Sequence, residues 1–130
     1  MPSIFSKIIA GEIPCYKIAE NSDFIAFLDV FPLKKGHALV VPKKEVDYIF
    51  DLDDETYKGL MSFAKQVSVA IKQAVPCNRI GLSVIGLEVP HAHIHLIPIN
   101  TVNDMNFSNE KLKFTKDEFE EIAAQIRKYI

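Results

Sequence analysis

Three histidines alternate with apolar residues in one short run of the chain, residues 91–97. On a β-strand, successive side chains point to opposite faces, so His91, His93 and His95 would share one face. The apolar residues between them would share the other face and pack on a core. Burying three imidazoles together costs free energy through lost hydration and through repulsion between their charged forms. The pattern therefore predicts a strand with one face packed on a core, and the three imidazoles on its other face indicate a chemical role.

The composition fits one globular domain over residues 1–130, because 48% of the residues are hydrophobic and 25% are charged. The net charge is −2 with both signs mixed, so we expect no nucleic acid as a partner. We also expect no membrane association and a cytoplasmic location, because neither a membrane-spanning run nor a signal peptide is apparent. Cys15 and Cys77 are the only cysteines, which argues against a disulfide framework or a cysteine zinc site.

The local patterns predict an α+β fold, in which a mostly antiparallel five-stranded sheet carries one long helix and shorter terminal helices. Ser3 can cap a first helix over residues 3–10. Apolar residues at helical spacing predict the long helix over residues 53–75. Thr115 with Glu118 resembles a capping box that opens the last helix. Strands are expected at residues 15–20, 23–28, 37–41, 79–85 and 91–97, with Pro42 and Pro98 as stops and residues 100–113 as loop.

Four interpretations of the histidine cluster compete. The three side chains could be structural, could share one zinc ion with a position left for water, could supply a neutral imidazole as nucleophile, or could bind an anion without chemistry. Strict alternation makes a purely structural role a poor explanation. The histidines alone divide the zinc site and the nucleophile about evenly.

The wider sequence adds a resemblance. Residues 91–97 resemble the signature of the histidine-triad (HIT) family, in which histidine alternates with apolar residues. The resemblance extends, in order and at family spacing, to an N-terminal segment at residues 3–14 and to nucleotide-binding strands at residues 27–32 and 36–43. It runs from about Ser3 to Pro98, and it implies a HIT-like fold.

The resemblance implies hydrolysis or transfer at the α-phosphate of a purine nucleotide. In the family the middle histidine attacks phosphorus and forms a nucleotidyl-histidine intermediate, and this role falls on His93. By the same resemblance, His95 would contact the phosphate on the leaving-group side, and His91 would orient and polarise the site. No metal and no cofactor take part in the family's chemistry.

The resemblance also implies a nucleotide pocket. Asp29 would accept hydrogen bonds from the ribose hydroxyls, because a carboxylate accepts two at once. His37 maps to a family histidine beside the nucleotide, although a core or strand-start histidine is an equal interpretation of the residue itself. By the resemblance, the base would lie between apolar side chains, although each of them, taken alone, is more often plain core: Phe5, Ile13, Phe27 and Val30.

The sequence departs from the family at a structural zinc site that some bacterial members carry. The two cysteine positions correspond to Ser3 and Ser6, and one histidine position corresponds to Glu45. Three of the four ligands are thus replaced, and we expect no structural zinc.

A second departure precedes the triad, where many members carry a hydroxyl residue that binds the phosphate. Here residues 86–90 include Glu88, and an ionised carboxylate would repel a phosphate at close range. Glu88 would therefore either point away from the phosphate or favour a cationic or hydroxyl-bearing leaving group, and Ser83 is a candidate replacement donor. The favoured activity is hydrolysis of a nucleoside phosphoramidate. The alternatives are dinucleoside polyphosphate hydrolysis, a nucleotide-binding adaptor with vestigial activity, and, apart from the family, a zinc hydrolase.

Family members commonly pair as homodimers, and the long helix is apolar enough to serve such an interface. The sequence leaves the physiological substrate open.

Overall fold

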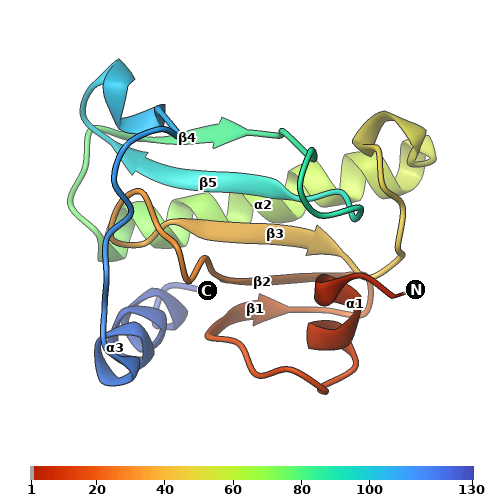
Figure 1. Cartoon of the computed structure of the whole chain (residues 1–130), viewed down its shortest axis with the longest axis horizontal. Coiled ribbons are helices and arrows are strands. Elements are labelled where there is room, and N and C mark those ends of the chain that lie inside the picture. The colour runs from red at the N-terminus through yellow and green to blue at the C-terminus, as the bar shows by residue number, and fades with distance from the viewer. Residues whose placement is uncertain (1) are drawn as a thin grey trace.

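Five antiparallel strands form one sheet in the order β1-β2-β3-β5-β4 (Figure 1), as a computed structural model describes it for residues 2–130. The strands are β1 (Lys17–Glu20), β2 (Phe24–Leu28), β3 (Ala38–Pro42), β4 (Arg79–Ser83) and β5 (Ile94–Ile99). The helices are α1 (Ile4–Ile9), α2 (Asp54–Ala74) and α3 (Lys116–Arg127), with short 3₁₀ turns at Ile49–Asp51 and Val102–Met105. The predicted fold class is thereby confirmed.

The long helix α2 crosses one face of the sheet, behind it in Figure 1. Its apolar side follows the predicted helical spacing and includes the fully buried Leu60, Val67 and Ile71. The same buried cluster takes in the apolar residues that alternate with the histidines: Ala92, Ile94 and Leu96. The opposite face of β2 and β3 is covered by α1 and forms a smaller apolar cluster of Phe5, Ile25, Phe27, Leu39 and Val41. The histidines therefore lie on the side of the sheet that faces away from α2.

Capping residues mark the starts of the three helices, and two of them, Ser3 and Thr115, were predicted as caps. The Ser3 hydroxyl accepts a hydrogen bond from the Ser6 amide at the start of α1, and Asp53 caps α2. Both reciprocal bonds of the Thr115–Glu118 capping box are present at α3. Local sequence chemistry thus sets these three boundaries.

The predicted bounds of the histidine strand were wrong at both ends. The strand β5 begins only at Ile94, because the amide of Ala92 donates to the carbonyl of Val46, after β3, rather than to β3 itself. Pro98 does not stop β5, which continues to Ile99. The pairing of β5 with β3 ends at Leu96, so the missing N–H of Pro98 lies beyond that ladder and interrupts nothing.

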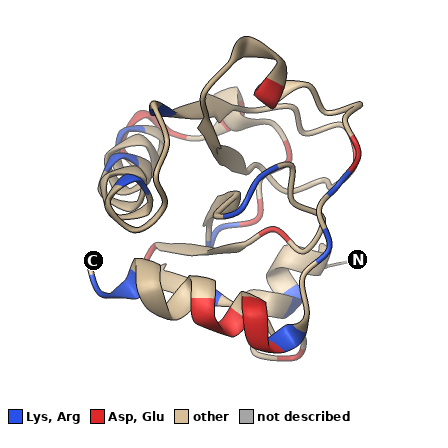
Figure 2. Ribbon diagram, turned by 90° about the vertical axis from the view of Figure 1, so that its left-hand side faces the viewer, with Lys and Arg blue, Asp and Glu red and all other residues tan. Residues whose placement is uncertain are grey.

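Charged residues are spread over the helices. In Figure 2 the acidic residues group on α3, at the bottom of the view, and lysines follow α2 at the left. With a net charge of −2, neither sign dominates the chain. No helix within residues 2–130 combines the length and the apolar character that crossing a membrane requires.

Candidate active site

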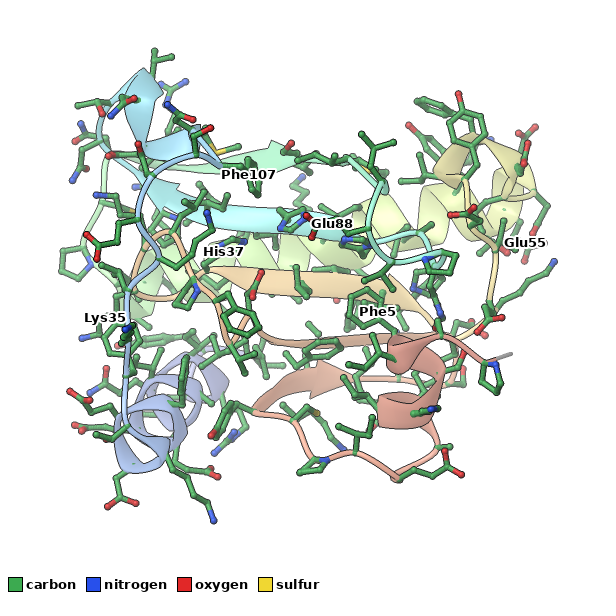
Figure 3. All side chains as sticks on the ribbon, viewed as in Figure 1. Phe5, Lys35, His37, Glu55, Glu88 and Phe107 are labelled. Carbon is green, nitrogen blue, oxygen red and sulfur yellow. The ribbon has the colours of Figure 1, made fainter. Side chains whose placement is uncertain are left out.

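Four separate segments bring side chains to the sheet face opposite α2. Figure 3 labels one residue from each: Phe5 from α1, His37 from the loop before β3, Glu88 from the loop before β5, and Phe107 from the segment after the second 3₁₀ turn. All four surround the same stretch of β3 and β5, where the triad lies. The sequence thus assembles the site from segments far apart along the chain.

The ring of His93 has one nitrogen committed and one free. Its Nδ1 atom lies 2.8 Å from the carbonyl oxygen of His91. A carbonyl can only accept, so Nδ1 carries the proton and Nε2 of the neutral ring carries a lone pair. Nε2 makes no hydrogen bond within residues 2–130. Every fully buried side-chain nitrogen or oxygen in that range has a hydrogen-bond partner, so Nε2 is not fully buried and is open to the site. The ring of Phe5 packs edge-on against His93, with a centroid distance of 4.9 Å. This is the tautomer and the orientation that a nucleophilic imidazole needs.

The ring of His91 points away from this opening. It is fully buried, its Nδ1 accepts a hydrogen bond of 2.7 Å from the Ser3 hydroxyl, and its Nε2 donates to the carbonyl of Pro42 at 2.7 Å. Burial holds the pKa of His91 below its ordinary value. The contribution of His91 to the site is therefore its backbone carbonyl, which holds the ring of His93.

A hydrogen-bonded cluster surrounds His91 on its other side. Glu45 accepts from the amide of Ser3 at 2.7 Å and from the hydroxyl of Ser6 at 2.6 Å. These bonds hold the pKa of Glu45 down to about 2. Ser3, Ser6 and Glu45, which by the resemblance stand at family zinc-ligand positions, thus lie together beside His91. Hydroxyl groups are poor zinc ligands compared with thiolates, so the donor set does not suit zinc.

His37 and His95 form a second imidazole pair. The amide of Leu33 donates to Nδ1 of His37 at 3.0 Å, which places the proton of neutral His37 on Nε2. That proton is shared with Nδ1 of His95, 3.0 Å away. Since His95 accepts at Nδ1, its own proton lies on Nε2, where it is available to an oxygen of a bound substrate. Burial is the main cause that lowers the pKa of His37 to about 3 and that of His95 to about 4.

Asp29 follows β2 and lies beside this pair. One carboxylate oxygen accepts from the amide of Phe31 at 2.8 Å, and the other is 3.5 Å from Nε2 of His37. Burial raises the pKa of the carboxyl group. Ligand atoms of Asp29, His37 and His95 lie within 4.8 Å of one another, close enough to be considered for a metal ion. However, Nε2 of His37 already donates a hydrogen bond to Nδ1 of His95, so these two nitrogens have partners without a metal.

Comparisons with known proteins agree with this geometry. The family model described as the HIT domain matches residues 10–102. The chain belongs to the HIT family. A HIT-like protein of Borreliella burgdorferi is 34% identical over 95% of this chain and 94% of its own length. An adenosine 5′-monophosphoramidase of Schizosaccharomyces pombe is 41% identical over 75% of this chain and 74% of its own. A crystal structure of a Hit-like protein from Bartonella henselae aligns with a TM-score of 0.85 and 31% identity, covering 98% of this chain and 96% of that one.

The other residues predicted from the HIT resemblance differ in their surroundings, and not all of them belong to one cluster. Phe27 packs against Phe5 in the smaller apolar cluster. Ser83 is paired with His95 across β4 and β5, so the two side chains share a face. Val30 is half exposed just after Asp29, and Ile13 is half-buried after α1; neither belongs to the cluster around Phe5. Glu88 is exposed, and its charge acts on Asp29.

The structure adds two residues that the sequence did not single out, and both lie beyond the stretch matched by the HIT model. Phe107 packs edge-on against His95 with a centroid distance of 5.0 Å, and it lies 6.3 Å from His37. The charge of Lys111 acts on both Asp29 and His37. Residues 100–113 show no periodicity, so the sequence offered only one local sign that Phe107 is partly buried: it is a phenylalanine among polar residues.

Proposed function

We propose that this chain is a nucleotide hydrolase of the phosphoramidase type, in which His93 attacks the α-phosphorus of a purine nucleoside phosphoramidate. The observation that supports this most is the bond from Nδ1 of His93 to the carbonyl of His91, which makes Nε2 the lone-pair nitrogen of the neutral ring and leaves it without a protein partner. A neutral imidazole presented in this way needs no further deprotonation before it attacks.

The chemistry proceeds in two displacements. In the first, Nε2 of His93 forms a bond to phosphorus, and the bond from phosphorus to the amine nitrogen breaks. The amine, which takes up a proton from water, departs. In the second, water attacks phosphorus, the bond to Nε2 breaks, and the nucleoside monophosphate leaves with release of a proton. Throughout, Nδ1 of His93 keeps its proton, because the carbonyl of His91 holds it.

The remaining side chains bind and orient the nucleotide. The Nε2–H of His95 donates to a phosphate oxygen, where negative charge is concentrated during each displacement. Asp29 accepts from the ribose hydroxyls, and its burial strengthens such bonds. The purine lies against apolar side chains led by Phe5 and Phe27. His37 fixes the ring of His95 through its Nε2–H.

An amine leaving group is favoured over a phosphate leaving group on two grounds. The Schizosaccharomyces pombe relative bears the name of an adenosine 5′-monophosphoramidase. In addition, Glu88 is exposed in the loop before β5 and places negative charge near the site. A carboxylate attracts a cationic amine and repels a polyphosphate.

The activity is tested by measuring release of adenosine monophosphate from adenosine 5′-phosphoramidate and from a dinucleoside polyphosphate. We expect the phosphoramidate to be turned over faster. We expect His93→Ala to reduce turnover at least about a thousandfold, while adenosine monophosphate still binds. Normal turnover by His93→Ala would refute the mechanism. Faster turnover of the polyphosphate would keep the mechanism and overturn the substrate class.

We also propose that the chain forms a homodimer through β4 and α2. The strand β4 is an edge of the sheet, and an apolar hollow lies between it and α2, lined by Met61, Ala64, Ile80 and Leu82 among others. Leu82 is 46% exposed and Val69 is 51% exposed. A second copy would cover both residues and the free edge. Sedimentation is expected to give a dimer that Leu82→Glu weakens; a wild-type monomer at high concentration would contradict this.

The single-domain organisation, the cytoplasmic location and the lack of a cofactor stay predictions.

A further inference from the structure

The segment of residues 106–112 lies beside the pair of His37 and His95. It follows the 3₁₀ turn Val102–Met105 and precedes α3, outside the part of the chain that the HIT model matches. From it, the half-buried ring of Phe107 packs against His95, at an interplanar angle of 76° and a centroid distance of 5.0 Å. The same ring lies 6.3 Å from His37. One side chain therefore touches both members of the second imidazole pair.

The segment is held in place by its own hydrogen bonds. The amide of Asn109 donates to the carbonyl of Asn106 at 3.0 Å, and the amide of Ser108 donates to the side chain of Asn106 at 2.9 Å. At its end, the amide of Leu112 donates to the carbonyl of Pro32 at 2.8 Å. Pro32 belongs to the loop that follows Asp29, so the C-terminal end of the segment is fixed beside Asp29.

Within the segment, the side chain of Lys111 bonds to the backbone of Phe107. Its ammonium group donates to the carbonyl of Phe107 and, at 3.0 Å, to the carbonyl of Asn109. Lysine carries three donors, so one stays available. These bonds restrain the backbone of Phe107 and hold its ring over His95.

We propose that Phe107 is a positioning residue that keeps the ring of His95 in the orientation required by the substrate phosphate. This inference rests on the proposed function, since it assigns His95 the phosphate as its partner. The ring of Phe107 blocks rotation of His95 about χ2 and excludes water from its edge. Without it, His95 could turn over and exchange the nitrogen that accepts from His37 with the nitrogen that donates to phosphate.

Several charged or titratable groups lie around His95; burial lowers its pKa, and of these groups only the charge of His93 acts on it directly in the same direction. His93 lies beside it on the same run, and His37 bonds to it from the loop before β3. Asp29 and Lys111 lie beyond His37, and Glu88 acts on Asp29. None of these groups changes when Phe107 is replaced, so a change in the titration of His95 would report the loss of the aromatic cover itself.

The first experiment follows the ring protons of His95 by NMR in the protein without substrate. In the wild type we expect no titration between about pH 7 and about pH 5.5, whereas in Phe107→Ala we expect the resonance to titrate in this range. Phe114→Ala is the matched control, because Phe114 is a half-buried phenylalanine of the same connection that packs on Phe119, away from the triad. An unchanged His95 titration in Phe107→Ala would overturn the proposal.

The second experiment measures turnover of adenosine 5′-phosphoramidate. We expect Phe107→Ala to lower kcat about tenfold with KM changed less than about twofold, Phe107→Tyr to restore most of it, and Phe114→Ala to leave it unchanged. Lys111→Met should lower kcat in the same direction, whereas the exposed Lys113→Met should not. Equal kcat in Phe107→Ala and wild type would overturn the proposal. If the wild type turns over no nucleotide, the proposed function fails, and the NMR experiment still decides the role of Phe107.

Discussion

The Nδ1 atom of His93 lies 2.8 Å from the backbone carbonyl oxygen of His91, two residues earlier in the chain. The ring of His91 is in turn fixed on both nitrogens, by the Ser3 hydroxyl and by the carbonyl of Pro42. The orientation of the proposed nucleophile therefore depends on a buried histidine that does not itself face the opening. His91 thus acts on the proposed nucleophile through its backbone carbonyl and not through its ring.

Replacing Ser3 with alanine should destabilise the fold. The substitution leaves the Nδ1 acceptor of buried His91 without a donor and removes the N-cap of α1. The expected loss is about 2 to 4 kcal/mol in the free energy of unfolding, measured in urea. Ser62→Ala, at an exposed position of α2, is the control and should change stability by less than about 0.5 kcal/mol. Similar effects of the two substitutions would show that the Ser3–His91 bond contributes nothing.

Acidification should destabilise the protein below about pH 6.5. The pKa of buried His37 is lowered from 6.5 to about 3, so between these values the unfolded chain binds a proton that the folded chain does not. Stability is thus complete above pH 6.5 and falls as the pH drops, by about 2 kcal/mol for this histidine at about pH 5. His91 and His95 act in the same direction. Urea unfolding at several pH values measures the slope, His37→Gln should reduce it, and a flat profile would contradict the burial of neutral imidazoles.

Removing the charge of Glu88 should shift substrate preference. We expect Glu88→Gln to lower the ratio of kcat/KM for a phosphoramidate with a cationic amine over that for a dinucleoside polyphosphate by about tenfold. Glu110→Gln removes an exposed carboxylate from the segment beyond Phe107 and serves as the control. Should both variants keep the wild-type ratio, Glu88 would have no part in choosing the leaving group.

Chelation should leave the activity intact. His93 acts through a lone pair, and the cluster of Ser3, Ser6, Glu45 and His91 satisfies its polar groups by mutual hydrogen bonds. We expect metal analysis to find well below one zinc per chain, and dialysis against a chelator to preserve both turnover and stability. Stoichiometric zinc, or a loss of turnover that added zinc restores, would contradict this expectation and favour the zinc hydrolase interpretation of the triad.

Most of the fold could be predicted from the sequence because its signals are local. The capping residues Ser3, Asp53 and Thr115 mark the helices that they begin. The alternation at residues 91–97 correctly separated the core side from the histidine side. The side chains of an extended chain point to alternate faces whether or not its backbone is hydrogen-bonded in a sheet. The start of β5 could not be predicted, since it depends on which distant segment accepts the amide of Ala92.

The site was predicted less completely than the fold. The triad, Asp29 and His37 occur in motifs with family spacing, so each could be named. Phe107 and Lys111 could not, because they reach the site through a tertiary bond between Leu112 and Pro32. No local pattern encodes that contact. The tautomers of the four histidines also depend on such partners, and only the structure supplies them.

The most direct test of the account is to isolate the intermediate. The protein is mixed with adenosine 5′-phosphoramidate, turnover is stopped rapidly with alkali, in which a phosphorus–nitrogen bond to histidine survives, and the peptides are analysed by mass spectrometry. The account predicts one adenylyl group per modified chain, located on His93 and absent from His93→Ala. Adenylyl on another residue, or steady turnover with none on His93, would contradict it.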